Sequence, residues 1–402
     1  MGFVAEEVKD RRSRKDFLRV TESLYQHDPH WVCPLDEEIE TIFSPEKNVY
    51  FTHGEANRWV IRDASGTTVG RIGAFINRKK AFINEFPTGG IGFFECIDDQ
   101  EAANLLFDTA KTWLSERGME AMDGPVNFGE NDRYWGLLVE GFTQPTFEMY
   151  HHLPYYRKLF ETYGFQVYFE QTSNEMDLTR PLPERFEKIA RWVMEKDGIE
   201  FKHGSWKKRW EFVKVLQEVY NDAWQYHENF TPLQDEQLRR LMKDFRFIAI
   251  EAFLPYVEIK GESAAFILCI PDLNQIFKPF KGRFPLWKKL LFLLRSRNEF
   301  AWYRKRGILT RGRVIIMGAK PKFQKHGLEA GMIISSFDYA RKLGFKAIEL
   351  SWVGDFNPKM ERLHQATGAT PIHKHITYRC PFDPARKIKR YATISRDPRV
   401  KE

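Results

Sequence analysis

The sequence predicts an α/β (α+β) protein made of two consecutive units, each of which alternates strands with amphipathic helices. Its 402 residues are many for a single domain. The same kind of unit can be read in both halves, and two prolines within Asp177–Pro183 interrupt the hydrophobic periodicity between them. We therefore expect one domain over residues 1–175 and a second over residues 176–402.

The first half contains a predicted hairpin followed by strands and helices. Residues 57–76 alternate in hydrophobicity, which predicts a β-hairpin, and Gly90–Ile97 has the composition of a buried strand. The apolar spacing of Gln100–Arg117 predicts a helix that Asp98 or Asp99 can cap. The remaining predicted elements are a strand over Glu120–Phe128 and a short helix over Tyr155–Tyr163.

The second half has a similar order, with a basic and aromatic insertion at residues 277–306. Its predicted elements are helix Glu184–Lys196, strand Ile199–His203, helix Lys207–Trp224, a helix from Pro232 to about Met242, strands Phe247–Leu254 and Ala264–Ile270, strand Val314–Ile316, a helix ending near Gly344, strand Ile348–Val353 and a helix from Asn357 to Leu363.

The turn between strand Val314–Ile316 and the next helix is the most informative segment. Gln324, Lys325, His326 and Gly327 lie in this turn, where successive backbone N–H groups point outward at the positive end of a helix dipole. Such a turn can bind a pyrophosphate. The cationic side chains nearby belong to Lys320, Lys322, Lys325 and His326. The dinucleotide and nucleoside-triphosphate fingerprints are absent, because no matching glycine pattern and no Gly-Lys-Ser/Thr is present.

This turn resembles the acyl-CoA loop of the GNAT N-acyltransferase superfamily, which reads Val-x-Pro, a short spacer, and then Gln/Arg-x-x-Gly-x-Gly/Ala. Pro321, Gln324 and Gly327 match the pattern, and Ala319 stands for the Val. Glu329 occupies the position that the family usually gives to Gly or Ala. This departure matters because a small residue there lets the phosphate approach closely.

A second GNAT motif follows at the expected distance. Asn357, Leu363 and Gly368 match it, and His364 lies where the family usually has a Tyr. Residues 159–165 repeat this motif in the first half. The resemblance therefore implies two tandem GNAT-like domains, each with a mixed, mostly antiparallel sheet flanked by helices.

The first half lacks the phosphate turn. Asp98 and Asp99 lie where a pyrophosphate would need hydrogen-bond donors, and carboxylates at a helix N-terminus repel phosphate. We expect acyl-CoA, or the phosphopantetheine of an acyl carrier protein, to bind only in the second half. The first half would shape the acceptor site or simply pack against its partner domain.

The resemblance implies that an amine attacks the acyl thioester directly, without a metal. Backbone N–H groups at Met317, Gly318 and Ala319 would hold the pantetheine and polarise the carbonyl. The residues expected to bind the co-substrate are Met317, Gly318, Ala319, Lys322, Gln324, Lys325, His326, Gly327 and Asn357.

The groups that move protons are less clearly marked, because strand Arg313–Gly318 lacks the carboxylate that often serves as the base in this family. The candidates are His227, Glu228, Glu349, Asp355 and His364. His364 is the candidate acid, because it lies at the family's Tyr position; the alternative is a surface or capped histidine. Glu228 is otherwise a solvated loop carboxylate, Glu349 otherwise a sheet-edge residue, and Asp355 a helix cap.

The insertion predicts contact with lipid. Residues 286–294 are strongly apolar but too short to cross a bilayer, and Arg283–Arg306 contains eight Lys or Arg and one acid, Glu299. This pattern suits an interfacial helix at 284–306 on anionic lipid, or a buried helix that closes an acyl groove. Pro271–Asn274 and Phe280–Pro285 resemble the bacterial ceramide synthase group, which implies long-chain N-acylation.

Composition narrows the partners and the compartment. The net charge is +7 and the sequence pI is about 9.0, which favours anionic partners. The four cysteines form no Cys-x-x-Cys pair, and no signal peptide or run of 18 apolar residues is present. We expect a cytoplasmic protein, possible peripheral contact with the inner face of the membrane, and no nucleic-acid binding, for which no motif is found.

Three function classes follow from these features. The first is an acyl-CoA-dependent N-acyltransferase with a lipid-like amine acceptor such as a sphingoid base. The second is an N-acetyltransferase that acts on a small amine or a protein. The third is a non-catalytic acyl-CoA or lipid binding module, which Glu329 and the missing strand carboxylate favour.

Overall fold

The computed structural model describes residues 2–83, 85–225 and 247–393, and also residues 232, 233, 235, 238 and 239. In the first half, the predicted hairpin, buried strand and helices all form, and the predicted strand at 120–128 is shorter. The elements of this half are β1 (Val4–Glu7), α1 (Arg11–Leu24), α2 (Asp36–Ile42), β2 (Gly54–Arg62), β3 (Thr68–Asn77), β4 (Thr88–Cys96), α3 (Gln100–Ser115), β5 (Ala121–Gly124), β6 (Leu137–Glu140), α4 (Tyr156–Tyr163) and β7 (Gln166–Asp177).

The second half follows the predicted order of helices and strands. Its elements are α5 (Glu184–Met194), β8 (Ile199–His203), α6 (Arg209–Ala223), β9 (Pro255–Ile259), β10 (Glu262–Pro271), α8 (Asn274–Phe277), α9 (Leu286–Arg295), α10 (Arg297–Arg304), β11 (Arg311–Ala319), α11 (Leu328–Lys342), β12 (Ala347–Gly354), α12 (Pro358–Ala366) and β13 (Thr370–Pro381).

One predicted strand is wrong. Residues 251–253 form a 3-10 turn, and the strand begins only at Pro255. Ala252 and Phe253 are buried in that turn, and a short apolar run does not distinguish a buried turn from a strand. The predicted helix from Pro232 to Met242 lies largely outside the described residues.

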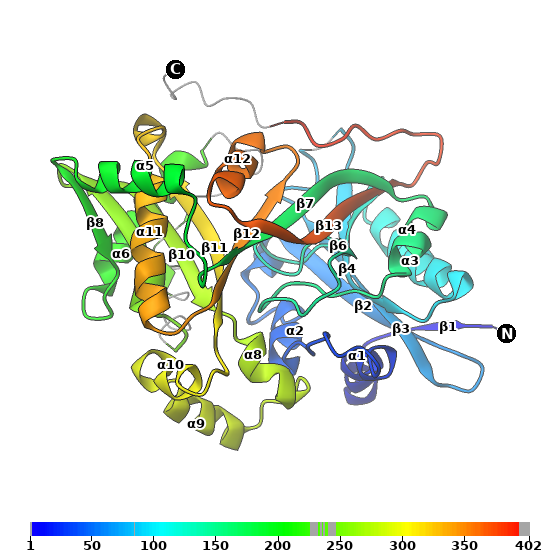
Figure 1. Ribbon diagram of the computed structural model, residues 1–402. Coiled ribbons are helices and arrows are strands. Elements are labelled where there is room, and N and C mark those ends of the chain that lie inside the picture. The colour runs from blue at the N-terminus through cyan, green and yellow to red at the C-terminus, as the bar shows by residue number, and fades with distance from the viewer. Residues whose placement is uncertain are drawn as a thin grey trace.

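The last strand of each half pairs inside the other half. All strands of the described residues join in one thirteen-stranded sheet, in the order β1-β2-β3-β4-β5-β13-β7-β12-β11-β10-β9-β8, with β6 paired to β13. The C-terminal strand β13 runs antiparallel between β5 and β7, and β7 in turn pairs antiparallel with β12. Figure 1 shows the red strand β13 beside the green strand β7 at the centre of the molecule. The two expected sheets are therefore continuous, mixed and mostly antiparallel.

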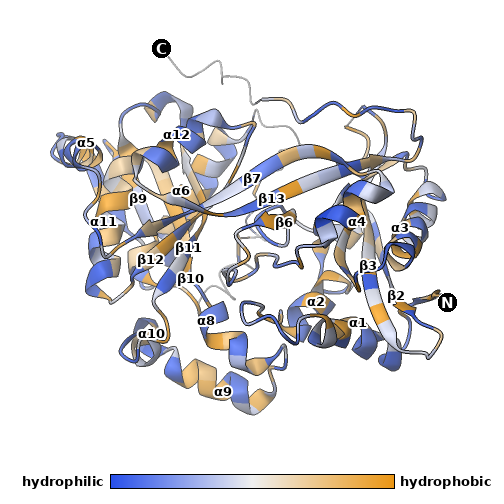
Figure 2. Ribbon diagram, turned by 45° about the vertical axis from the view of Figure 1, so that its right-hand side comes forward, coloured by the Kyte–Doolittle hydropathy of each residue, from blue (hydrophilic) through white to orange (hydrophobic). Residues whose placement is uncertain are grey.

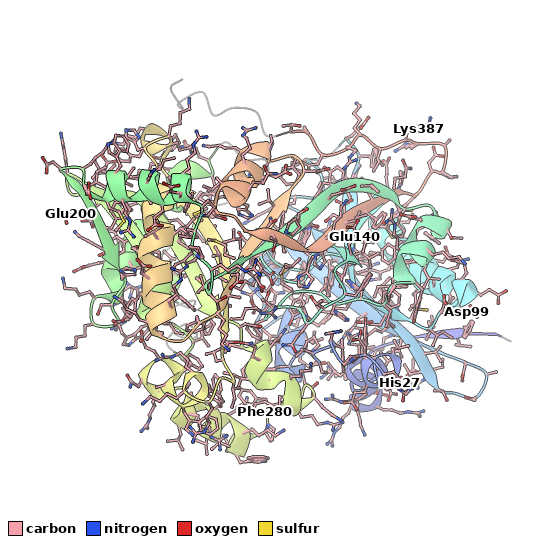
Figure 3. All side chains as sticks on the ribbon, in the orientation of Figure 1. His27, Asp99, Glu140, Glu200, Phe280 and Lys387 are labelled. Carbon is pink, nitrogen blue, oxygen red and sulfur yellow. The ribbon has the colours of Figure 1, made fainter. Side chains whose placement is uncertain are left out.

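Helices cover both halves of the sheet and bury its apolar side chains. In the first half α3 packs on β3, and Asp99, labelled in Figure 3, accepts a hydrogen bond from the N–H of Ala102 at 2.9 Å as the predicted cap. Aromatic rings fill this core, with Phe94 and Phe107 stacked at 4.7 Å and Phe160 at 4.9 Å from Phe107. Among the described residues, no helix combines the length and the apolar character that a membrane crossing requires.

The exchange of strands makes a testable prediction about cooperativity. Tyr378 lies on β13 but is fully buried in the core of the first half, with its ring 5.7 Å from that of Phe160. Tyr378→Ala should lower the free energy of unfolding by about 3–5 kcal/mol, because the cavity loses a large ring. Urea unfolding should remain a single transition. Phe337→Ala, in the core of the second half, should shift the same transition, and two separate transitions would contradict the account.

Candidate active site

A cleft opens where β11 separates from β12. The two strands pair in parallel only over Arg311–Arg313 and Ala347–Glu349. Beyond that point β12 stays paired with β7 as far as Gly354, whereas β11 stays paired with β10 as far as Ala319. A register shift opposite Leu268 and Cys269 also bends β11. The open edge of β11 therefore faces the cleft. The roles of Met317, Gly318 and Ala319 in binding the co-substrate stay predictions.

An apolar cavity extends from this cleft beneath α11. It is narrow, with a cavity volume of about 30 Å³. Its walls come from the 3-10 turn at 251–253 and from β9, β10, β11, β12, α11 and α12. The lining residues are Phe253, Pro255, Ile267, Cys269, Val314, Met317, Ile333, Ser336, Phe337, Ile348, Leu350, Ser351 and His364. The predicted residues Met317 and His364 thus share one cavity, and Gly318 lies under the ring of Trp224 from the end of α6.

The backbone of the predicted phosphate turn has the shape of an anion site. A short 3-10 turn over Pro321–Phe323 is followed by left-handed residues at Lys325 (φ +68°) and Gly327 (φ +75°). Alternating backbone conformations of this kind direct successive N–H groups into one concavity. The first i→i−4 bond of α11 runs from the N–H of Gly331 to the carbonyl of Gly327 at 3.3 Å, so the preceding N–H groups lie at the open helix terminus.

Side chains around the turn are partly neutralised. Lys320 Nζ and Lys322 Nζ both bind Glu262, at 3.1 and 2.7 Å. Gln324 donates from Nε2 to the carbonyl of Ala319 at 3.3 Å and accepts a hydrogen bond from Lys359. The turn would therefore hold a phosphate chiefly through its backbone.

The remaining residues of the turn and the neighbouring helix have different positions. His326 is exposed, with Nδ1 3.0 Å from the carbonyl oxygen of Phe323. Glu329 lies in the first turn of α11, as its sequence position predicts. Asn357 caps α12 by accepting a hydrogen bond from the N–H of Met360 at 3.3 Å. Its role in binding the co-substrate stays a prediction.

His364 lies on the wall of the cavity. It is 3% exposed, and its Nδ1 is 3.1 Å from the amide Nδ2 of Asn174. An amide nitrogen only donates, so Nδ1 accepts and we infer that the ring hydrogen is on Nε2. Burial lowers the pKa of His364 to about 4, so the ring is neutral at neutral pH. Its role as the acid stays a prediction. A ring that is neutral at neutral pH is better suited to donating a hydrogen bond than to giving up a proton.

Glu349 lies at the point where the strands separate. Its carboxylate is almost fully buried beside Arg313. Oε2 of Glu349 is 4.0 Å from Nδ1 of His373. On the other side of the same ring, Nε2 of His373 is 2.9 Å from the hydroxyl of the exposed Thr143. Burial raises the pKa of Glu349, and the charges of Arg311 and Arg313 oppose that rise. His373 was not among the site residues predicted from the sequence. It is two residues from His375, so both side chains lie on one face of β13.

The Pro-Asp-x-Asn segment holds a first-half loop over this region. Asp272 is fully buried and accepts hydrogen bonds from the N–H of Phe147 at 2.9 Å and from the guanidinium of Arg311 at 2.9 Å. Asn274 donates to the carbonyl of Pro145 at 3.0 Å, and Arg313 to that of Phe147 at 2.9 Å. The segment ends a strand, and it also joins the two halves.

The equivalent cleft of the first half is closed. β4 and β5 also pair in parallel over a short stretch, Thr88–Gly90 with Ala121–Asp123. The N–H of Val126 then donates to the carbonyl of Ile91 at 2.7 Å. Tyrosine hydroxyls accept the N–H groups of the open edge, Tyr150 from Phe93 and Tyr156 from Cys96, both at 3.0 Å. These contacts favour the expectation that the first half does not bind acyl-CoA.

His227 and Glu228 lie outside the described residues. Within the described part of the chain, no group of three or more His, Cys, Asp or Glu side chains is placed to hold a metal ion.

Comparisons with known proteins agree with the predicted fold. No family model matches the chain. Over 383 residues it is 29% identical to "Bacterial ceramide synthase" of Caulobacter vibrioides, covering 92% of this chain and 95% of the relative. It is 28% identical to "Protein YghO" of Escherichia coli over 381 residues, covering 92% and 93%. A tandem GNAT protein from the clavulanic acid biosynthesis pathway matches with a TM-score of 0.56 at 10% identity, covering 96% of this chain and 99% of that one. The resemblance to tandem GNAT proteins is confirmed for the fold.

The phosphate turn can be tested with a matched pair of glycines. Gly327→Asp should abolish measurable CoA binding in calorimetry, because it adds a carboxylate and a Cβ only 2.9 Å from Val193 at a left-handed position. Gly344→Asp is the control, since Gly344 also has a positive φ (+91°) at the other end of α11 and no atoms within 4 Å of its Cβ. Unchanged affinity in Gly327→Asp, or equal loss in both variants, would remove the turn as the site.

Proposed function

We propose that this protein is an N-acyltransferase that transfers a long acyl chain from acyl-CoA, or from an acyl carrier protein, to a lipid-like amine such as a sphingoid base. The observation that carries the proposal is the separation of β11 from β12, which leads from the phosphate turn into an apolar cavity. The similarity to a relative named "Bacterial ceramide synthase" supports this choice of acceptor. We place the reaction in the cytoplasm, at the inner face of the membrane.

The co-substrate would lie along the open edge of β11. Its pyrophosphate would bind the N–H groups of the turn at 325–329, and its thioester carbonyl would accept hydrogen bonds from backbone N–H groups at 317–319. Met317 and Leu350 line the cavity from opposite strands and would contact the acyl chain. Each buried CH₂ contributes about 0.8 kcal/mol, so apolar walls favour a long chain over acetyl.

The reaction needs a base, because an ammonium has no lone pair with which to attack. Glu349 would take one proton from the ammonium, which frees the nitrogen lone pair for attack. As the nitrogen bonds to the carbonyl carbon and the carbon–sulfur bond breaks, the nitrogen loses a second proton, which the leaving thiolate takes up to become the free thiol. His373 lies between Glu349 and the exposed Thr143 and would relay the proton from Glu349 toward solvent. His364, neutral and on the cavity wall, would donate a hydrogen bond to the leaving thiolate.

Two alternatives are separated by one substrate survey. An N-acetyltransferase of small amines or proteins would prefer acetyl-CoA, whereas a binding module, which Glu329 favours, would give no product. Purified protein should be incubated with acyl-CoAs of increasing chain length and with a sphingoid base, a small polyamine or a peptide, and the products identified by mass spectrometry. Long-chain amide formed only from the sphingoid base is the expected result.

The role of Glu349 predicts a pH dependence. Glu349 accepts a proton only when ionised, so turnover should fall as pH falls through its pKa, which burial raises above the ordinary glutamate value. Glu349→Gln should lower turnover about 10²-fold or more. Glu175→Gln, which alters the residue opposite Glu349 on β7, is the matched control and should keep most activity. An unchanged pH profile in Glu349→Gln would exclude Glu349 as the base.

His364 should act on turnover rather than on binding. His364→Ala should lower kcat with little change in acyl-CoA affinity, the pattern of a group that acts in the transition state. If His364 donates a hydrogen bond as a neutral ring, its loss should lower the rate by the same factor at every pH above its pKa of about 4. The shape of the pH profile should therefore not change. Wild-type turnover in the variant would leave His364 as a wall of the cavity only.

A further inference from the structure

Helix α9 exposes an unusually apolar face to solvent. Its exposed side chains are large and hydrophobic, and they are Leu286 (72% exposed), Trp287 (63%), Leu294 (56%), Leu290 (54%) and Leu293 (37%). At about 100° per residue these five positions cover an arc of about 120° on one side of the helix. Figure 2 shows the apolar residues of α9 at the lower end of the molecule.

The fold does not need this face, because a different side of α9 anchors the helix. Phe292 is buried, with its ring 5.3 Å from Phe277, 5.8 Å from Phe284 and 6.0 Å from Phe300. Phe280, which belongs to the same group, is labelled at the lower end of Figure 3. Phe292 lies on the opposite side of the helix from the exposed leucines and is therefore the anchor. The exposed leucines are left for another partner.

Cations border the exposed face on both sides. Lys288 lies over the rings of Phe280 and Trp287, at 4.7 and 5.6 Å, and Arg295 lies over Trp302 at 4.0 Å. Neither has a carboxylate partner among the described residues. Lys289, on the other border, is paired with Glu37. Ring contacts leave the positive charges of Lys288 and Arg295 available to a further anion.

We propose that α9 docks this protein on the surface of an anionic lipid bilayer, with Trp287, Leu290 and Leu294 at the boundary of head groups and acyl chains. Apolar residues bordered by Lys and Arg are typical of helices that lie in this interface. Ten residues of helix span about 15 Å, too little to cross a bilayer. A second copy of the chain is a poorer occupant, because it would bring the same positive border against the first.

The docking surface takes no part in the transfer reaction itself. Docking would, however, place the active site near a lipid-like acceptor in the bilayer. The segment that anchors α9 continues from Asn274 and Phe277, and Asn274 holds the loop at 145–147 beside the proposed base. Docking through α9 would therefore bring the junction of the two halves toward the lipid surface. A lipid-like amine could then reach the site without crossing bulk water.

Vesicle flotation tests the proposal with the full-length protein. Wild-type protein should float with vesicles of phosphatidylcholine containing phosphatidylglycerol, bind vesicles of phosphatidylcholine alone at least about tenfold less, and dissociate as salt rises. Leu290→Glu with Leu294→Glu should lower binding about tenfold or more. Lys288→Glu with Arg295→Glu should remove the preference for anionic lipid. Trp192→Glu is the control, because Trp192 is 58% exposed on α5, at the opposite end of the molecule from α9 in Figures 1 and 2.

Four readouts separate the outcomes. Thermal unfolding of the Leu290/Leu294 variant should match that of wild type, and a lost cooperative transition would mean that the face is core. Light scattering should give the same mass for wild type and variant, and a wild-type dimer that the variant abolishes would assign the face to a second copy. Flotation that is equal in wild type and in this variant would also overturn the proposal. CoA binding should be unchanged in it, so a failure here leaves the proposed transfer reaction intact.

Discussion

The pairing of β12 with β7 is the constraint on which the site depends. β12 comes from the second half and β7 from the first, and they pair over Ala347–Leu350 and again, after a register shift, at Val353 and Gly354. Beyond Glu349, β12 follows β7 through a register shift between Leu350 and Val353, whereas β11 remains with β10, so the two strands separate. The cleft and the apolar cavity are consequences of that choice of partner. A strand exchanged between halves thus shapes a site whose phosphate turn lies wholly within one of them.

The two halves show how one arrangement of strands can be open or closed. In both, a short stretch of parallel pairing is followed by separation of the strands. In the first half, Val126, Tyr150 and Tyr156 satisfy the backbone groups that separation exposes, and Asp99 caps the helix that would otherwise face a phosphate. In the second half the turn carries Gly327, and apolar side chains line the opening. Buried backbone N–H and C=O groups must be hydrogen-bonded. In the first half, other groups of the same chain make these hydrogen bonds and close the cleft.

Local patterns in the sequence predicted most elements and the tandem fold, because hydrophobic period, caps and glycines act over a few residues. The cap at Asp99 and the tight turn that contains Gly327 are examples. The predicted cap at Asp355 is wrong, because Asn357 caps α12 instead. Long-range placement could not be read in the same way. Nothing near Tyr378 indicates that it packs in the first half, and nothing near His373 indicates its approach to Glu349 and Thr143. The buried Asp272 also looked like an ordinary turn residue until its contacts across the junction were seen.

The central claim is that one acyl-CoA binds per chain, in the cleft between β11 and β12. A crystal structure with a non-hydrolysable thioether analogue of a long-chain acyl-CoA tests it most directly. The account predicts the pyrophosphate over the turn at 325–329, the thioether sulfur beside residues 317–319, and the acyl chain against Met317 and Leu350. An analogue bound in the first half, or bound in the second half with its acyl chain outside the cavity, would contradict it.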